Sequence, residues 1–588
     1  MELHPLGDRA LLVRLGDSID AATHRRVRAL CARLEARPPP GLTEYVPAYA
    51  SVAVHYAPAA LPPGRAPHQQ TADALGAALS ARDDAEPPPP RVVELPVLYG
   101  GEAGPDLEEL ARHHGLTPEE VVRLHTAGDY LVYMLGFAPG FPYLGGLDER
   151  LATPRRATPR THVPAGSVGI GGAQTGVYPI DSPGGWHLIG RTPLRLFDPQ
   201  ADPPTLLRMG DRVRFVRQDS GFTDGLPATG CRLPANPGVA GSWKPVAGSL
   251  FPESRILVLS AGLLTTVQDL GRAGHQREGV PVGGALDALA LRVANLLVGN
   301  EPGAAGLELT LAGAVLRFEA DTLLALAGAD LGARLDDVAL PPGRAGRAPA
   351  GATLTFERRR SGCRAYLAVA GGIDVPPVLG SRSTFVRAAL GGLDGRALRA
   401  GDVLPLGRPS PLAETIAAAL RRQGGEGVGV ARWGVGRELQ PTVAGSAHVR
   451  LLPGAHLAAL TDAARQALFT AEFRVSPRSD RTGYRLDGPR LELAAALELL
   501  SEPVACGTVQ LPPDGRPIVL LADRQTVGGY PRPGEVASVD LPLLAQLAPG
   551  DTLRFRACTL AEAQAALLAQ ERALARARAA VAVQVRGA

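Results

Sequence analysis

The chain has 588 residues, of which 45% are apolar and 4% aromatic, and its 61 basic and 58 acidic residues nearly cancel. This length predicts three or more domains, and the apolar fraction excludes a wholly disordered protein. The balanced charge, without a long basic block, argues against the concentrated basic surface that nucleic-acid binding needs.

The first part of the chain, residues 1–86, is expected to form a small α/β unit. Apolar residues recur at helical spacing in its first helix, and Ser18 or Asp20 stands where an N-cap is expected. The expected elements are a strand over Leu11–Leu15, a helix over Asp20–Ala36, a strand region over Val46–Tyr56 and a helix over Thr71–Ala81. Pro87–Pro90 then forms a stiff spacer that marks a boundary.

Residues 91–218 are expected to form a β-rich domain, because Pro-Gly, Gly-Gly and Asp-Ser-Pro turns separate short apolar runs. Its first expected elements are a strand over Val92–Leu98 and helices over Asp106–His114 and Thr117–Thr126. Residues 219–254, rich in Gly, Pro, Ala and Ser, are interpreted as a linker.

A second β-rich body is expected over residues 255–558. Its expected helices are Leu286–Leu297 and Pro411–Arg422. Residues 559–588 are expected to hold a closing helix from Leu560 to about Ala580, and Thr559 with Glu562 matches a capping box. The alanine- and arginine-rich face of this helix predicts packing on a body or on a partner, and not catalysis.

Two pairs of turn-and-strand sequences repeat along the chain. Gly166-Ser-Val-Gly-Ile is followed by Gly210-Asp-Arg-Val-Arg-Phe, and Gly507-Thr-Val-Gln-Leu is followed by Gly550-Asp-Thr-Leu-Arg-Phe. Gly401-Asp-Val-Leu is a weaker third match. Gly-Asp turns are common in β proteins, so chance is one explanation, but the shared order favours repeated barrels of one kind.

The chain contains a single lysine, Lys244. It therefore lacks the Gly-Lys-Ser/Thr triplet of a P-loop and the strand lysine of a protein kinase. None of its three methionines, Met1, Met134 and Met209, adjoins that lysine, so the Met-Lys-Met motif that carries biotin is missing and no covalent biotin is expected. If the chain handles a nucleotide or carboxybiotin, arginines and backbone amides must bind it, or a partner must.

Neither a targeting segment nor a metal site is expected. Charged residues interrupt the first fifteen positions, which excludes a signal peptide there, and no run of about 18 uncharged apolar residues predicts a membrane span. The cysteines lack any CxxC spacing, which fits a reducing cytoplasm. They are Cys31, Cys231, Cys363, Cys506 and Cys558.

Longer motifs follow one another in both halves. Those of the first half are Gly136-Phe-Ala-Pro-Gly-Phe-Pro-Tyr-Leu-Gly145, His162–Ile170, Gln174–Pro179 and Ser182-Pro-Gly-Gly-Trp-His-Leu-Ile-Gly-Arg-Thr-Pro193. Those of the second half are Thr266–Arg272, Gly299-Asn300 with Glu308, Ala370–Asp374, Gly380–Thr384, Ser479–Arg485 and Ala522–Pro531. The first set resembles KipI-like proteins, also called allophanate hydrolase subunit 1, and the second resembles KipA-like proteins, or allophanate hydrolase subunit 2. Nearly the whole chain is thus similar to a KipI–KipA fusion, which corresponds to the B and C subunits of bacterial 5-oxoprolinases within a biotin-dependent carboxyltransferase-like family.

This resemblance implies a mainly β fold with an α+β N-terminal unit and multiple cyclophilin-like β-barrels, one in the first half and two intertwined in the second. It implies a cytoplasmic, oligomeric enzyme component that uses ATP with Mg²⁺ to open 5-oxoproline to glutamate, together with a LamB/YcsF-type partner, the A component of 5-oxoprolinase. Two other settings stay open. One is a carboxyltransferase module for urea or another small amide, supplied with carboxybiotin by a separate chain, and the other is a regulator that binds a sensor histidine kinase.

Both amide reactions need an acceptor for an amide N–H and cationic or backbone donors for the oxygen, which Asp/Arg pairs in glycine-rich turns can provide. In the second half the catalytic candidates are Glu308, Asp480, Arg481, Asp523 and Arg524, and the substrate-binding candidates are Asp269, Arg272, Tyr484 and Tyr530. The structural alternative is a buried Asp–Arg pair that only holds a turn. Glu308 lies in an apolar strand, where a buried carboxylate needs a partner.

The first half offers fewer candidates. His162 could act as an acid, base or donor near neutral pH, although structural histidines are more common. Tyr178 and Trp186 could form the wall of a substrate pocket or pack in a barrel core. A run of glycines could cradle phosphate through backbone amides or form a tight hairpin. These glycines are Gly166, Gly169, Gly171 and Gly172.

Overall fold

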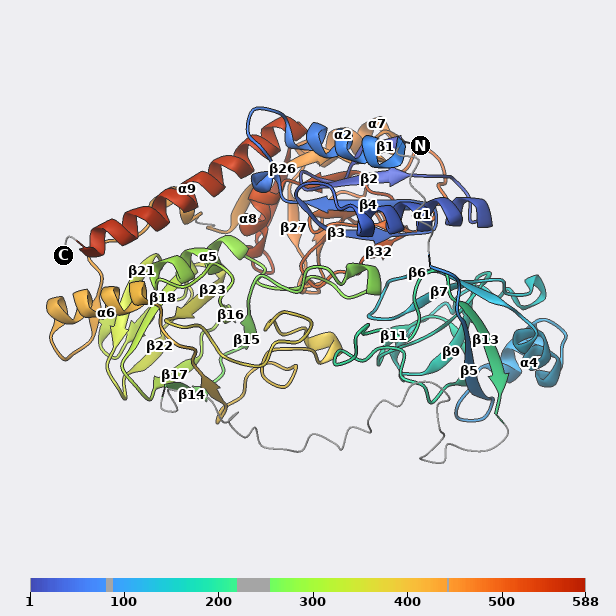
Figure 1. The fold of residues 1–588 in the computed structure, drawn as a ribbon, viewed down its shortest axis with the longest axis horizontal. Coiled ribbons are helices and arrows are strands. Elements are labelled where there is room, and N and C mark those ends of the chain that lie inside the picture. The colour runs from blue at the N-terminus through green and yellow to red at the C-terminus, as the bar shows by residue number, and fades with distance from the viewer. Residues whose placement is uncertain (1, 81–87, 219–253, 442–443, 587–588) are drawn as a thin grey trace.

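The computed structural model describes residues 2–80, 88–218, 254–441 and 444–586. Strands dominate it, as expected: they form two closed barrels of seven strands, a four-stranded sheet and two six-stranded sheets (Figure 1). Lys244, Cys231 and all of the expected linker except Ser254 lie outside the described residues.

The N-terminal unit is an antiparallel sheet in the order β1-β2-β4-β3, and it separates two apolar clusters. Leu11 and Val13 face α1 and α2, whereas Leu12 faces Met134 of the first barrel and Val527 of the second. The alternation along β2 therefore places this sheet between its own helices and both barrels. The elements are β1 (Glu2–Pro5), β2 (Ala10–Arg14), α1 (Ala21–Ala36), β3 (Leu42–Pro47), β4 (Ser51–Tyr56) and α2 (Pro67–Ser80).

Asp20 is the N-cap of α1, and its carboxylate accepts the N–H groups of Ala22 and Thr23 at 2.8 Å each. Ser18, the alternative cap, donates its hydroxyl to Asp20 instead. The strand region expected over Val46–Tyr56 is wrong in detail. It contains the end of β3, a turn and all of β4, because the two strands form a hairpin.

The first barrel follows the order β5-β12-β9-β10-β7-β6-β13, and β13 closes it by pairing in parallel with β5. Leucines and valines of α3 and α4 enter its core, which explains why both expected helices form. A small ladder of β8 and β11 lies beside it. The elements are β5 (Val92–Tyr99), α3 (Leu107–His113), α4 (Pro118–Thr126), β6 (Tyr130–Leu135), β7 (Pro142–Gly145), β8 (Arg160–Val163), β9 (Ser167–Gly171), β10 (Gln174–Val177), β11 (Ser182–Gly184), β12 (His187–Arg191) and β13 (Arg212–Arg217).

Two six-stranded sheets come next and share one apolar core. The first has the order β20-β19-β22-β17-β14-β24 and the second β15-β16-β23-β18-β21-β25. α5 and α6 cover the outer face of the second sheet. The elements are β14 (Arg255–Ser260), β15 (Leu264–Gln268), α5 (Ala288–Leu297), β16 (Gly306–Thr310), β17 (Val315–Phe318), β18 (Thr322–Asp330), β19 (Ala333–Leu335), β20 (Val338–Ala339), β21 (Arg344–Ala348), β22 (Thr353–Phe356), β23 (Ser361–Val369), β24 (Val403–Pro405), α6 (Pro411–Gly424) and β25 (Gly429–Val430).

The second barrel repeats the topology of the first strand for strand, in the order β26-β33-β30-β31-β28-β27-β34. Its last strand again pairs in parallel with its first, and a ladder of β29 and β32 takes the place of β8 and β11. The elements are β26 (Ser446–Pro453), α7 (Asp462–Thr470), β27 (Phe473–Val475), β28 (Gly483–Asp487), β29 (Glu502–Pro503), β30 (Thr508–Gln510), β31 (Ile518–Leu520), β32 (Val527–Gly528), β33 (Gly534–Val536), α8 (Leu541–Ala545) and β34 (Thr552–Ala557).

The repeated turn-and-strand sequences therefore belong to equivalent strands of two similar barrels. Gly210 and Gly550 have φ values of +93° and +92°, which favour glycine, and each is followed by an aspartate that accepts a backbone N–H three residues back. Gly401 has the same turn, with φ of +90°, but it leads into β24 of an open sheet. The expectation of two intertwined barrels in the second half thus needs correction, since one of the two bodies is a pair of packed sheets.

The closing helix α9 (Leu560–Arg586) begins at the expected capping box, in which Glu562 accepts the N–H and hydroxyl of Thr559. It runs from the N-terminal unit across α5 to α6 (Figure 1). Its buried residues, such as Leu574 and Val581, join the cluster under α5 and α6, so it packs on this chain's own body. Within the described ranges, no helix is long and apolar enough to cross a membrane.

Candidate functional site

A buried carboxylate on β16 is the centre of a charge network between the second sheet and the second barrel. Leu307 and Leu309 face the shared core, so the alternation of the strand turns Glu308 to the opposite face. There Glu308 is 1% exposed, and its Oε2 accepts the Tyr366 hydroxyl at 2.7 Å and the Leu286 N–H at 2.9 Å. Tyr366 is the direct partner of Glu308 across the β16–β23 ladder.

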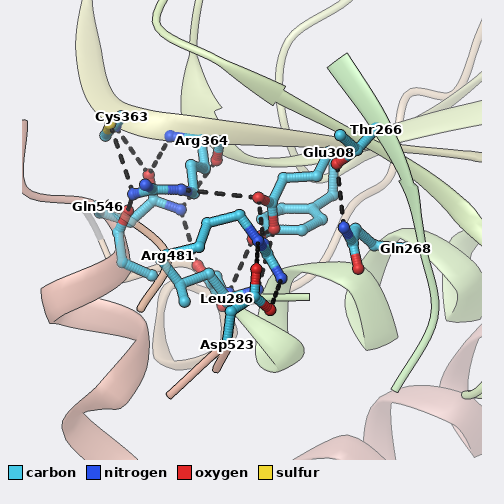
Figure 2. Close-up of polar contacts among 12 residues, drawn as sticks. Thr266, Gln268, Leu286, Glu308, Cys363, Arg364, Arg481, Asp523 and Gln546 are labelled. Carbon is cyan, nitrogen blue, oxygen red and sulfur yellow. Dashed lines mark hydrogen bonds and ion pairs between the residues drawn. The ribbon is translucent and has the colours of Figure 1, made fainter. Parts of the chain in front are cut away.

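Arg481, from the loop before β28, supplies the countercharge (Figure 2). Its Nη1 donates to Glu308 Oε1 at 2.6 Å, while its Nε and Nη2 donate to the two oxygens of Asp523 at 2.9 and 3.1 Å. Nη2 also donates to the Gly284 carbonyl at 2.5 Å. One guanidinium thus joins two carboxylates from different parts of the fold, an arrangement in which every ion is paired.

The two carboxylates respond differently to this environment. Burial alone would raise the pKa of Glu308, but the Arg481 and Arg364 guanidinium groups outweigh it and hold the pKa below its ordinary value. For Asp523 burial dominates, and Arg481 offsets it only in part, so the pKa of Asp523 is raised. Glu308 is therefore the fixed negative charge, and Asp523 is the better proton acceptor of the pair.

A second group of polar side chains surrounds this pair, and sequence reasoning missed most of it. Arg364 Nη1 donates to the Tyr484 hydroxyl at 2.6 Å and to the Ala545 carbonyl at 2.7 Å. The Gln546 amide accepts the Cys363 and Arg364 N–H groups and donates to Asp287 Oδ2 at 2.7 Å. Figure 2 shows Arg364 and Gln546 beside the Glu308–Arg481 pair. These contacts attach the second barrel to the second sheet.

Arg272 lies next to this network and is 1% exposed. Its Nη2 donates to the Ser383 carbonyl, while its Nε and Nη1 have no hydrogen-bond partner among the described residues. A side-chain carbon at Gly283 would lie 3.4 Å from Arg272 Nη1 and 3.6 Å from Asp523 Oδ1. One of the two unsatisfied guanidinium donors, Nη1, therefore lies beside the same glycine as the Asp523 carboxylate, which is the strongest sign of ligand binding in the network.

Asp269 has a structural role. Its Oδ1 accepts the hydroxyls of Ser381 and Ser383 at 2.6 and 2.5 Å, and its Oδ2 accepts the Arg382 N–H at 2.6 Å. It also accepts the Gly271 N–H at 2.7 Å. These bonds fix the Gly380–Thr384 motif against the Thr266–Arg272 motif, and so they position Arg272.

Three other second-half candidates do not join the Asp523 pair. Asp480 is exposed, and its carboxylate accepts the N–H groups of Thr482 and Gly483 in its own turn. Arg524 points away from its neighbour Asp523 and donates to Gln276 Oε1 at 2.7 Å. Tyr530 is 45% exposed. Tyr484 does belong to the surrounding group, because its buried hydroxyl meets Arg364.

The first-half candidates lie elsewhere. His162 is exposed, and its Nε2 lies 3.5 Å from Asp181 Oδ2. Tyr178 and Trp186 are buried with Phe141 in one aromatic cluster, which favours their packing role. Side-chain carbons at Gly169 and Gly171 would approach Trp186 at 3.2 and 2.4 Å, so these glycines make room for the Trp186 side chain.

The other two glycines of the candidate phosphate-binding run are Gly172 and Gly166. Gly172 lies in the hairpin turn with φ of +65°, and a side-chain carbon added there would meet no neighbour within 4 Å. Gly166, at φ +83°, packs against the Thr192 carbonyl. The four glycines thus do not share one phosphate cradle.

The Gly136–Gly145 motif forms the contact between the two halves. Gly140 donates its N–H to the Glu278 carbonyl at 2.7 Å, and a side-chain carbon at Gly279 would lie 2.4 Å from the Ala138 carbonyl oxygen. A side-chain carbon at Gly136 would lie 2.4 Å from Val527 of the second barrel. The close packing of the two halves therefore leaves no room for a side chain at Gly136.

Comparison with known proteins identifies the family. Residues 1–207 match the family described as carboxyltransferase domain, subdomain C and D, and residues 278–557 match carboxyltransferase domain, subdomain A and B. The B subunit of 5-oxoprolinase from Bacillus subtilis is 50% identical over 221 residues, which cover 37% of this chain and 92% of that protein. The C subunit of 5-oxoprolinase from Escherichia coli is 42% identical over 317 residues, which cover 54% of this chain and 95% of that protein. The chain belongs to this family. It joins counterparts of the B and C subunits in one polypeptide.

A solved structure and a more distant relative agree with this assignment. The crystal structure of a protein named TTHA0988 is 38% identical, with a TM-score of 0.76 over 93% of this chain and 99% of that one. Urea amidolyase of Saccharomyces cerevisiae is 31% identical over 323 residues, which are 52% of this chain and 17% of that protein. The expected relation to a KipI–KipA fusion is thus confirmed, with urea carboxylation enzymes as remoter relatives.

Proposed function

We propose that this chain supplies the B and C parts of a bacterial ATP-dependent 5-oxoprolinase, which opens 5-oxoproline to glutamate. The observation that supports it is that one polypeptide covers 92% of a named B subunit and 95% of a named C subunit. In this proposal the chain works in the cytoplasm, as part of an oligomer with a LamB/YcsF-type A component. Its own substrate is the small cyclic amide.

The chemistry explains why an ATP-dependent enzyme is needed. The lactam carbonyl is a poor electrophile, because the ring nitrogen donates electron density into it. ATP with Mg²⁺ supplies a phosphoryl group that makes the amide oxygen a leaving group. The residues of this chain must then orient the lactam, accept its N–H and hold its carboxylate in a site that excludes water.

The Arg272–Asp523 region supports these roles. The Nε and Nη1 donors of Arg272, which lack partners among the described residues, suit a carboxylate such as that of 5-oxoproline. Asp523, with its raised pKa, suits acceptance of the ring N–H or its proton. Arg481 and Glu308 act as positioning residues, because the Glu308 charge holds the guanidinium that orients Asp523.

The first test is reconstitution. The purified chain is assayed for ADP and glutamate with 5-oxoproline, with and without a LamB/YcsF-type partner. Glutamate formation coupled to ADP release in the mixture supports the proposal. If the cognate mixture forms neither product while both proteins are folded, the proposal is wrong.

A second test separates substrate binding from folding. Arg272→Gln is expected to raise KM for 5-oxoproline by about tenfold to a hundredfold, which is the loss of one or two charged hydrogen bonds. The wild type should prefer 5-oxoproline to 2-pyrrolidinone, which lacks the carboxylate, and the variant should lose that preference. A purely structural role for Arg272 would instead lower the melting temperature and leave the preference intact. Arg485→Gln, an exposed arginine on β28, is the matched control.

Carboxyl transfer to urea or another small amide is the second candidate, favoured by the family description and by the urea amidolyase relative. The same Asp523 and Arg481 groups would serve it, since it also requires an N–H acceptor and cationic donors. Carboxybiotin would come from a separate chain. Release of free biotin from carboxybiotin that depends on urea, with no ADP formed from 5-oxoproline, would support this candidate.

A further inference from the structure

A cleft of about 730 Å³ lies between the first barrel and the second half of the chain, apart from the Arg272–Asp523 region. Its walls come from the loop before β9, from the loops after β10 and β12, and from the 3-10 helix η4 (Val386–Ala388) with Ala389 and Leu390. Figure 1 shows η4, in yellow, reaching toward the first barrel near β11. The volume lies within the range of small-molecule sites.

The charge of the cleft is positive. Three arginines and one aspartate line it: Arg191, Arg195, Arg387 and Asp181. Arg195 pairs loosely with Asp198 at 3.7 Å, and Asp181 accepts the Ala165 N–H at 2.8 Å and faces His162. Arg387 makes no hydrogen bond or ion pair with any other described residue, and it comes from the opposite half to the other two.

The floor of the cleft is apolar. Phe197 and Leu390 are buried there in a small cluster with Phe385, and Ile180 packs against it. A cleft with an apolar floor and an arginine rim can bind a ligand that is flat and apolar at one end and multiply anionic at the other. A nucleoside triphosphate has this character.

Backbone strain is located on the same wall. Ala389 adopts a left-handed conformation with φ +50° and ψ +43°, which is unfavourable for a residue other than glycine. On the facing wall, Gly166 leaves no room for a side chain, because its carbon would lie 2.4 Å from the Thr192 carbonyl oxygen. Strain of this kind persists where the surrounding structure fixes it, and it is typical of binding sites.

We propose that this cleft binds the nucleoside triphosphate, with Arg191 and Arg387 on the polyphosphate and the apolar floor beneath the base. The inference rests on the proposed function and adds the place of the nucleotide. It also gives a chain without a Gly-Lys-Ser/Thr triplet a means of binding a nucleotide, since arginines take the role of the P-loop lysine. Because the arginines come from both halves, neither half alone forms the site.

The experiment is direct titration of the purified chain, alone and mixed with a LamB/YcsF-type partner, by calorimetry with ATP, pyrophosphate and adenosine. Arg387→Ala and Arg191→Ala are each expected to weaken ATP binding by about tenfold, the loss of one arginine–phosphate contact. Arg432→Ala and Arg214→Ala, exposed arginines away from the cleft in the second and first halves, remove the same charge and should stay within about twofold.

Unchanged ATP affinity in both cleft variants overturns the inference, as does tight binding of pyrophosphate without any gain from the nucleoside. Melting temperatures confirm that the variants fold, which is expected because both side chains are exposed. Glutamate formation is measured in parallel. If the wild type forms glutamate but the cleft variants bind the nucleotide as tightly as the wild type, only the nucleotide site in the cleft is refuted. If the wild type forms no glutamate, the proposed function is refuted.

Discussion

Replacing Arg481 with methionine removes the countercharge of two buried carboxylates while keeping an unbranched side chain of similar length. In the wild type Arg481 makes four hydrogen bonds, two to Asp523, one to Glu308 and one to the Gly284 carbonyl. The side chains of Arg481, Glu308 and Asp523 are 10%, 1% and 9% exposed, so water does not replace these bonds.

Breaking a buried ion pair on one side costs about 3–5 kcal/mol, because the partner charge stays buried without compensation. For a cooperative unit of about 150–250 residues that corresponds to a fall in melting temperature of about 6–20 °C near neutral pH. The pH dependence adds a second signature. Without Arg481 the lowered pKa of Glu308 rises and the raised pKa of Asp523 rises further, so both carboxyls take up protons as pH falls and the deficit shrinks toward about pH 5.

Melting curves of Arg481→Met, the control Arg485→Met and the double variant Glu308→Gln with Arg481→Met would be compared across pH. The double variant should recover part of the loss, because it no longer buries a Glu308 charge that has lost Arg481 and retains only Arg364, at 3.7 Å. A fall of less than about 2 °C in the single variant, or a deficit independent of pH, would refute the view that Arg481 compensates these carboxylates.

Three further outcomes are expected. Burial raises the pKa of Glu535 from its ordinary value of 4.5 to about 7, so its contribution to stability is complete below about pH 4.5 and is lost as pH rises through 7. Glu535→Gln, which still accepts the Thr508 hydroxyl, should melt higher than wild type at about pH 8.5 and equally at about pH 4, and equal melting at both would contradict this. Burial likewise raises the pKa of Asp287 to about 6, so the contribution of this group to stability is complete below about pH 4 and is lost as pH rises through 6. Over this window, the melting temperature of Asp287→Asn should change less with pH than that of the wild type. An unchanged slope would argue against this role of Asp287. Thr559→Ala breaks the capping box with Glu562 and should cost about 1 kcal/mol, seen as faster amide exchange in the first turn of α9, with no change elsewhere in that helix.

Much of the local structure was predictable, because it depends on neighbours in the sequence. The Asp20 cap, the Thr559 capping box and the helices at Leu286 and Pro411 follow from residues within a few positions of one another. Gly210 and Gly550 have a positive φ, and the repeated turn-and-strand sequences that begin at these glycines predicted barrels of one kind. The motifs of the two halves predicted the family.

The site depended on contacts that no local pattern encodes. Arg481 is 173 residues from Glu308 and 42 from Asp523, and Arg364 meets Tyr484 across 120. The sequence identified Arg481, Asp523 and Glu308 as chemical candidates, but it paired Arg481 with the adjacent Asp480, which caps its own turn instead. The sequence by itself determined which residues carry charge and which strands alternate. Only tertiary packing decided which charges meet, because a buried ion must be paired by whatever side chain the neighbouring barrel brings within reach.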